Sequence, residues 1–327
     1  MPETFSLNHH ISDIMQDYIK ELDFKCQHPN ELRGISTGYD RLDERMGGLK
    51  AGEVTLIGAR PAMGKTAFAL NLAYNMAASF EARHTQNKAD DKCVVYIALE
   101  LPPNLFAKKM LALQSLIPFY KLNESADICE NFNKIMESGR ALNHLPLYYV
   151  GGIYDVDEIE NILLKSEKQI GCVIIDHLQM LGGEDYSRED YSLIMLQIKA
   201  LAAFFNVPVI VLTQLKRELE LRADKRPLCS DIRGFSKNQN AADNILFLYR
   251  ENYYICYAEP QKYKRETDKH FKMRFKEWQT RSKETEKLCE VIIAKNANGR
   301  YGTVKLYFDF ATGLFAPWQS DFDELLS

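Results

Sequence analysis

Short β-rich runs alternate with segments of helical periodicity over residues 54–213, and this pattern restricts the possible folds more than any other feature. The runs read VTLIG, VVYIAL, LPLYYV, CVIID and VPVIVLT. Continuous apolar strands separated by helices predict a parallel sheet covered on both faces. Three later runs, ILFLY, EVIIAKN and TVKLYFD, lack such intervening helices and predict antiparallel strands added at a sheet edge. We therefore expect an α/β protein.

Composition excludes several other classes of protein. With 46% apolar residues among 327, the chain can build a core and is not a disordered polymer. Its 41 basic and 45 acidic side chains give a net charge of −4, so any nucleic acid must be held locally. Seven separated cysteines without a CxxC pair favour a reduced, cytoplasmic protein without zinc. We see neither a signal peptide nor a membrane span and expect no membrane partner.

The strongest local motif follows the first β-rich run. VTLIG leads into ARPAMGKT and then into a helical segment, which is the strand, loop and helix order of a phosphate-binding loop. Gly64 lets the backbone approach the phosphates, Lys65 would reach the β- and γ-phosphates, and Thr66 would ligate Mg²⁺. The strict pattern begins with glycine where this chain has Ala59. The expected ATP-binding residues are Ala59, Arg60, Pro61, Ala62, Met63, Gly64, Lys65, Thr66 and Ala67.

Polar residues end three other predicted strands. Asp176 closes CVIID, where it can hold the magnesium shell, and Glu100 follows VVYIAL, where it can polarise an attacking water. Gln214 closes VPVIVLT as a polar sensor. Each alone is equally typical of an ordinary strand end, but together with Lys65 they predict a nucleotide hydrolase. His177 neighbours Asp176 in a strand, so we expect it to point to the other face and to be structural.

Long stretches of the sequence carry a family resemblance. GISTGYDRLDERMGGLKAGEVTLIGARPAMGKTAFALNLAYNMA, VIIDHLQML, FLYRENYY and EVIIAKNANGRYGTVKL resemble the C-terminal motor domain of DnaB-type replicative helicases. The resemblance covers residues 31–327 and implies a RecA-like P-loop ATPase that forms a ring, usually a hexamer, around single-stranded DNA. It gives Lys65 and Thr66 the phosphate and metal roles, Glu100 that of catalytic glutamate, Asp176 that of magnesium ligand and Gln214 that of sensor. The family shares the departure at Ala59.

Residues 1–30 form a separate segment in this interpretation. Apolar residues at steps of three and four between Asn8 and Leu22 predict an amphipathic helix. From the sequence alone, its apolar stripe could pack on its own domain or on a neighbouring subunit. The family has a linker helix here that docks on the adjacent subunit. Its N-terminal collar domain, which meets primase, is expected to be absent from this chain.

A cluster of basic residues follows Gln214. The family's DNA-contacting loops would map near Gly182–Asp190 and Lys216–Asn240, and a ring of such clusters would hold phosphates without reading sequence. The alternative is that these side chains pair with Glu218, Glu220, Asp224 and Asp231 on the surface. The expected DNA-binding residues are Lys216, Arg217, Arg222, Lys225, Arg226, Arg233 and Lys237.

A polar insertion occupies about residues 259–288. Lys and Arg outnumber Asp and Glu there, and Tyr263, Phe271, Phe275 and Trp278 are interleaved with them. Such a stretch could contact nucleic acid. We favour a solvated helix whose aromatic face packs on the domain.

The sequence departs from the family near its end. The family reads Lys-Gln-Arg-Asn-Gly where this chain has Lys295 followed by Asn-Ala-Asn-Gly, so Ala297 replaces an arginine that reaches the neighbour's ATP site. Lys295 keeps its place and its expected contact with nucleotide. Because such arginines accelerate hydrolysis by about 10³–10⁵, we expect Mg·ATP to be bound but hydrolysed slowly. The alternative to a helicase is therefore a weakened, DNA-binding or regulatory subunit that co-assembles with an intact helicase or a loader.

Overall fold

The computed structural model describes residues 10–28, 32–153, 155–181, 191–233, 241–297 and 299–318. The chain divides into two units, 1–33 and 34–327. The first contains helix α1 (Ile11–Gln27), so the predicted helix exists but begins and ends later than expected. The second holds every other element and begins close to the predicted boundary. Within the described ranges, no helix combines the length and apolar character that a membrane crossing needs.

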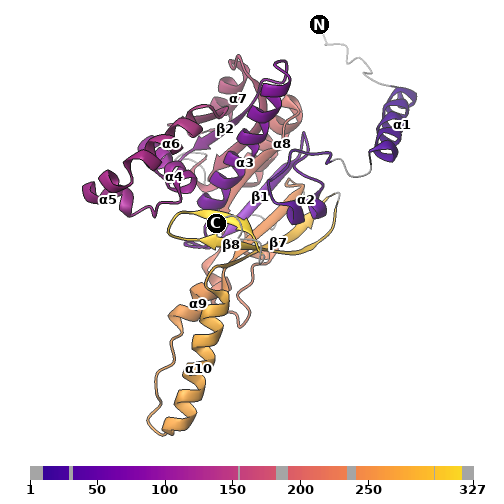
Figure 1. The fold of residues 1–327 in the computed structure, drawn as a ribbon. Coiled ribbons are helices and arrows are strands. Elements are labelled where there is room, and N and C mark those ends of the chain that lie inside the picture. The colour runs from indigo at the N-terminus through magenta and orange to yellow at the C-terminus, as the bar shows by residue number, and fades with distance from the viewer. Residues whose placement is uncertain are drawn as a thin grey trace. The chain divides into compact units, whose positions relative to one another are not determined.

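A nine-stranded sheet runs through the described part of the second unit in the order β3-β2-β4-β5-β1-β6-β7-β8-β9 (Figure 1). The six strands from β3 to β6 are parallel, and β7, β8 and β9 continue the sheet antiparallel. The predicted combination of a parallel sheet with C-terminal antiparallel strands is thus confirmed. The strands are β1 (Val54–Ala59), β2 (Lys92–Ala98), β3 (Leu147–Gly151), β4 (Gln169–Asp176), β5 (Val209–Gln214), β6 (Asn244–Tyr249), β7 (Leu288–Asn296), β8 (Gly302–Asp309) and β9 (Leu314–Pro317).

Two hydrophobic cores cover the two faces of the sheet. Alternate strand residues face opposite sides, and Ile174 and Val173 of β4 accordingly belong to different cores. One core is filled by α3 and α4, and the other by α7 and α8. The helices of this unit are α2 (Asp40–Met46), α3 (Lys65–Gln86), α4 (Pro103–Ser115), α5 (Ser125–Glu130), α6 (Phe132–Asn143), α7 (Val156–Leu164), α8 (Tyr191–Phe205), α9 (Glu251–Tyr257) and α10 (Asp268–Thr285), with short 3-10 turns at Lys121–Asn123, Leu178–Met180, Arg217–Leu221 and Cys229–Asp231.

The polar insertion is a pair of helices, α9 and α10, between β6 and β7. It therefore begins at Glu251, earlier than the predicted residue 259, because α9 is part of the same structure. The Trp278 indole N–H donates to the carbonyl of Ile255 at 2.8 Å, and Asn252 donates to the carbonyl of Ser282 at 2.7 Å. Most of α10 is exposed, as the favoured expectation of a solvated helix requires, but Trp278 packs on α9 of the insertion itself and not on the rest of the domain.

Candidate active site

The predicted site residues come together because parallel strands end at one edge of the sheet. Ala59 at the end of β1 pairs with Gln214 of β5, and Ala98 at the end of β2 pairs with Asp176 of β4. The chain turns after Ala59, and α3 begins at Lys65. The carboxyl ends of neighbouring parallel strands are the usual place for ligands in an open α/β sheet.

Gly64 joins the loop to α3 in a conformation that favours glycine. Its φ is +92°, and a Cβ there would lie 2.9 Å from Cζ of Phe308. A side chain would therefore be strained by the backbone and would collide with a buried ring. The glycine keeps the loop close to the helix N-terminus, where unpaired N–H groups attract phosphate.

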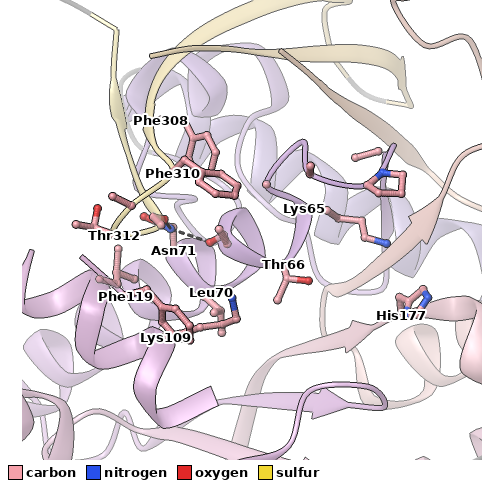
Figure 2. A pocket seen from close by; sticks show the side chains of 18 of the residues that line it. Lys65, Thr66, Leu70, Asn71, Lys109, Phe119, His177, Phe308, Phe310 and Thr312 are labelled. Atoms are coloured by element: carbon pink, nitrogen blue, oxygen red, sulfur yellow. Dashed lines mark hydrogen bonds between the residues drawn. The ribbon is translucent and has the colours of Figure 1, made fainter. Parts of the chain in front are cut away.

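A cavity of about 590 Å³ opens at this edge (Figure 2). In the figure, Lys65 and His177 lie on one side of it, and Lys109 and Phe119 lie on the other. Most of the predicted site residues line it, namely Ala59, Arg60, Pro61, Ala62, Gly64, Lys65, Thr66, Ala67, Glu100 and Gln214. The volume suits a nucleotide-sized ligand.

Lys65 is the central cation of the cavity. Burial lowers its pKa to about 8, and the charges of Asp176 and Glu100 oppose that fall. Asp176 itself is buried and does not line the cavity, and its carboxylate accepts a hydrogen bond from the Tyr96 hydroxyl at 2.8 Å. Glu100 lines the cavity with its side chain 72% exposed, so its carboxylate is open to water. The site thus combines a half-buried lysine side chain with one buried and one accessible carboxylate.

His177 is the clearest error of the sequence-based assignment. It lines the cavity, and its Nδ1 lies 3.5 Å from Oε2 of Glu100. The alternation rule fails because β4 ends at Asp176 and the chain leaves the strand there. Burial and the charge of Lys65 lower the pKa of His177, which favours the neutral imidazole.

Three residues that we predicted to bind the nucleotide have additional or different contacts in the structure. The Arg60 guanidinium lines the cavity but donates to Oε1 of Glu220 and to the carbonyl of Leu215, both at 2.9 Å. Met63 is 1% exposed and belongs to the core, so it contributes backbone only. Lys295 pairs with Ile245 at the amino end of β6, which is the sheet edge opposite the cavity. It is therefore outside the cavity of its own chain, and its Nζ donates to the carbonyl of Ala242 at 2.6 Å.

Sequence reasoning missed several residues of the cavity wall. Lys109 of α4 is one, and burial lowers its pKa while Asp176 opposes that fall. Gln179 positions Gln214 by accepting its backbone N–H at 3.1 Å, and VIIDHLQ was a usable signal because the glutamine follows the strand closely. Gln179 does not itself line the cavity. The remaining missed wall residues come from α3 and α4, are aromatic or lie in the β8–β9 turn, namely Leu70, Asn71, Leu113, Phe119, Phe308, Phe310, Ala311, Thr312 and Gly313.

Arg250 supports the phosphate loop from outside the predicted set. It is 8% exposed, it donates from Nη1 to the carbonyl of Ala62 at 3.0 Å, and its Nε has no partner among the described residues. Its guanidinium lies 4.9 Å from the ring centre of Phe308 and 5.7 Å from that of Phe310. Arg250 therefore joins the loop to the aromatic wall.

The predicted DNA-binding residues divide into two groups. Arg222 donates to both carboxylate oxygens of Asp231, at 3.0 and 2.8 Å, and Arg226 donates to both oxygens of Glu290, at 2.8 Å each. The surface-pairing alternative thus describes Arg222. It also describes Arg217, which lies 3.9 Å from Glu220, and in part Arg226, which lies 3.5 Å from Asp224 but has its shorter contacts with Glu290, a carboxylate that the alternative did not include. These guanidinium groups hold the loop together.

The other members of that set are less engaged. Arg217 and Arg233 are exposed, Lys216 donates to the carbonyl of Ser230, and Lys225 donates to the carbonyl of Arg222. Lys237 lies outside the described residues, as do 182–190 and 234–240.

Comparison with known proteins supports the same interpretation. The family model for the DnaB-like helicase C terminal domain matches residues 34–316. The replicative DNA helicase DnaB of Geobacillus stearothermophilus is 30% identical over 328 residues, 96% of this chain and 63% of the relative. The replicative DNA helicase DnaC of Bacillus subtilis is 31% identical over 324 residues, again 96% and 63%. The chain thus spans less than two thirds of the length of these relatives.

Two solved structures share the fold. One, an ATPase domain, has a TM-score of 0.76 at 27% identity and covers 95% of this chain and 100% of its own. A DnaB-like replicative helicase, studied with its interactions with primase, has a TM-score of 0.74 at 27% identity over 95% of this chain and 68% of its own. The expected RecA-like class is confirmed by these neighbours. Because the family model covers most of a chain whose strand ends converge on one phosphate-loop cavity, this chain belongs to the family of DnaB-like helicase C terminal domains.

Proposed function

We propose that this chain is the motor domain of an ATP-dependent DNA helicase that binds single-stranded DNA in a ring, usually a hexamer, and acts in DNA replication in the cytoplasm. The observation that carries the proposal is the cavity in which Lys65 and Thr66 share one edge of the sheet with Glu100. These three residues supply a phosphate-binding cation, a hydroxyl ligand for a metal ion and a general base.

The oxygen donors present suit Mg²⁺. A hydroxyl from Thr66 and a carboxylate from Asp176 are hard oxygen ligands, and Asp176 would act on the water shell of the ion because it is buried behind the wall. When bound, Mg²⁺ neutralises the charge of the β- and γ-phosphates.

The remaining residues divide the chemistry between them. Lys65 binds the phosphate oxygens through its ammonium group. Glu100 orients the attacking water and accepts its proton, which its exposure to solvent permits. Gln214 senses the γ-phosphate from the neighbouring strand end. The wall formed by Phe119, Phe308 and Phe310 offers apolar surface for a nucleobase.

Hydrolysis by this chain alone is expected to be slow. Ala297 follows β7 at the sheet edge opposite the cavity, where its N–H donates to the carbonyl of Asp243. A residue at that edge can serve only the cavity of a neighbouring chain, and an alanine supplies no charge there. Lys295 at the same edge is proposed to contact the neighbour's nucleotide. This is the observation that favours the second candidate, an ATP-binding subunit that co-assembles with an intact helicase.

DNA contact is proposed for Lys216, Arg217, Arg233 and Lys237. Arg222 and Arg226 then act indirectly, since their ion pairs fix the loop that carries the other residues.

Turnover and strand displacement decide between the two candidates. ATP hydrolysis should stay below ~10 s⁻¹, a typical enzyme rate, with or without single-stranded DNA. Ala297→Arg should raise turnover, and Lys65→Ala should abolish nucleotide binding as the matched negative control. Strand displacement by the chain alone supports the motor. If Ala297→Arg changes nothing and no strand is displaced, the chain is a binding subunit.

A further inference from the structure

The helix pair α9–α10 carries an exposed row of positive charge that the proposed motor does not use. In Figure 1 the pair extends away from the β-sheet, with α10 drawn in orange. Lys269, Lys272, Lys276 and Lys283 are all exposed, and they are spaced by three, four and seven residues. At 3.6 residues per turn they lie within an arc of about 60° on one side of α10. We call these four residues the lysine stripe.

The opposite side of α10 is the side that packs on α9. Trp278 bonds to Ile255, Ser282 accepts from Asn252, and Arg281 pairs with Glu251. This packing fixes the orientation of α10, so the lysine stripe faces solvent. The helix geometry places it on that side whichever rotamers the lysine side chains adopt.

Several acidic side chains of this region are already paired elsewhere. Glu266 accepts two hydrogen bonds from Arg274, at 2.8 and 2.7 Å, which lowers its pKa to about 2. Asp268 pairs with Lys262. Among the residues that the structure describes, no ammonium group of the lysine stripe has a hydrogen bond or an ion pair.

The stripe also opposes the stability of its own helix. Lys269 and Lys272 are three residues apart, and Lys272 and Lys276 are four apart, so like charges are neighbours on the helix surface. Such pairs destabilise a helix, and the carboxylate of Asp268, four residues before Lys272, is paired with Lys262. A polyanion laid along the stripe would remove the repulsion.

We propose that the lysine stripe binds the phosphate backbone of double-stranded DNA. Lys269 and Lys283 are 14 residues apart, which corresponds to about 21 Å along the helix axis. Phosphates of one strand of B-DNA are spaced about 3.4 Å along the axis, so the stripe matches about six base pairs. The choice of DNA among polyanions rests on the proposed function.

Duplex is favoured over single strand because the stripe has no stacking platform. Proteins that hold single strands combine basic side chains with aromatic rings that stack on bases. Here Phe271, Phe275 and Trp278 are half-buried, and Trp278 is bonded to α9. Tyr263 is exposed, but it precedes α10 and its ring already faces the guanidinium of Arg274, 4.6 Å from the ring centre. A straight row of point charges positions a backbone and reads no sequence.

The test measures binding of the full chain to a labelled 20-base-pair duplex and to one of its strands, by fluorescence anisotropy across a salt series. The stripe variant replaces all four lysines by glutamine, which keeps the helix because Gln is a good helix former. A matched control replaces four exposed lysines outside the helix pair, by Lys88→Gln, Lys134→Gln, Lys165→Gln and Lys305→Gln; none of their ammonium groups has an ion pair among the described residues.

The stripe variant should bind the duplex at least about tenfold more weakly at 0.1 M salt. Its slope of log K against log salt should be less steep by about 3.6, since each phosphate contact contributes about 0.9. Its affinity for the single strand and its melting temperature should not fall, and the control should bind both DNAs as the unmodified chain does.

Three results would overturn the inference. They are no duplex binding by the unmodified chain, an equal loss in the control, and an equal loss of single-strand binding by the stripe variant. Failure of the proposed motor function is a separate outcome, which would appear as an unmodified chain that does not bind single-stranded DNA or does not bind nucleotide. If such a chain still binds duplex DNA and the stripe variant binds it more weakly, the assignment of the lysine stripe still holds.

Discussion

Raising the pH from 7 to 9 should weaken nucleotide binding about tenfold, because Lys65 loses its proton in the empty cavity. Burial lowers the pKa of Lys65 to about 8, against the opposing charges of Asp176 and Glu100. A bound triphosphate places negative charge beside the ammonium and raises that pKa again. Binding above pH 8 therefore takes up a proton, and linkage makes affinity fall as pH rises.

The magnitude follows from the fraction of empty protein that carries the ammonium. With a pKa of about 8, that fraction is roughly nine-tenths at pH 7 and roughly one-tenth at pH 9. Below pH 7 the ionisation of Lys65 should not change the nucleotide affinity, since its side chain is charged both in the free protein and in the complex. The phosphates do not contribute to the change, because their last pKa is near 6. The neutral imidazole of His177 is favoured throughout this range, since its pKa is lowered.

Titration calorimetry with Mg·ATP at pH 7, 8 and 9 measures this directly. Lys65→Arg keeps its charge at all these values, so any binding that it retains should not change with pH. Lys109→Gln is the second control, because burial also lowers the pKa of Lys109. An affinity that stays within twofold between pH 7 and pH 9 would refute the reasoning. The same fall in Lys65→Arg would assign the proton to another group.

Three substitutions test other parts of the cavity. Glu100→Gln should lower turnover by about 10²–10⁴ with nucleotide affinity unchanged, as a lost general base does, and weaker binding in calorimetry would assign it to binding instead. Gly64→Ala should lower the free energy of unfolding by about 1–3 kcal/mol in urea titrations, because of its φ of +92° and the contact with Phe308, and an unchanged midpoint would contradict this. Arg250→Met removes the hydrogen bond to Ala62 and should lower both melting temperature and nucleotide affinity, whereas a lower melting temperature alone would limit Arg250 to a structural role.

The parallel part of the sheet was predictable because buried strands are continuous apolar runs. CVIID in β4 has this character, and all of its residues are buried. Helix α9, by contrast, reads ENYYICY, whose aromatic and β-branched residues are typical of strands. It is helical because α10 packs on it, and the local sequence of α9 does not reveal that packing. Strand β9 has four residues, too few to give a period.

The same distinction separates the cavity residues that were predicted from those that were missed. Lys65 and Thr66 were predictable as neighbours in one cavity because a strand, a loop and a helix adjacent in sequence bring them there. Phe308 and Phe310 reach the same cavity from about 240 residues further along the chain, through a strand pairing that the sequence does not specify. His177 was misplaced because strand alternation was extended one residue beyond the end of the strand.

The positive charges around the cavity explain why the residue at position 297 matters. Four cationic side chains approach the phosphate loop within the described chain, but Arg60 is held by Glu220 and Arg250 by the carbonyl of Ala62. Lys65 and Lys109 remain, and burial lowers the pKa of both. Under the proposed function, negative charge that develops during phosphoryl transfer would therefore meet few free cations of the same chain. A further cation would then have to come from a neighbouring chain, and the edge opposite the cavity offers Ala297 where the resemblance implies an arginine.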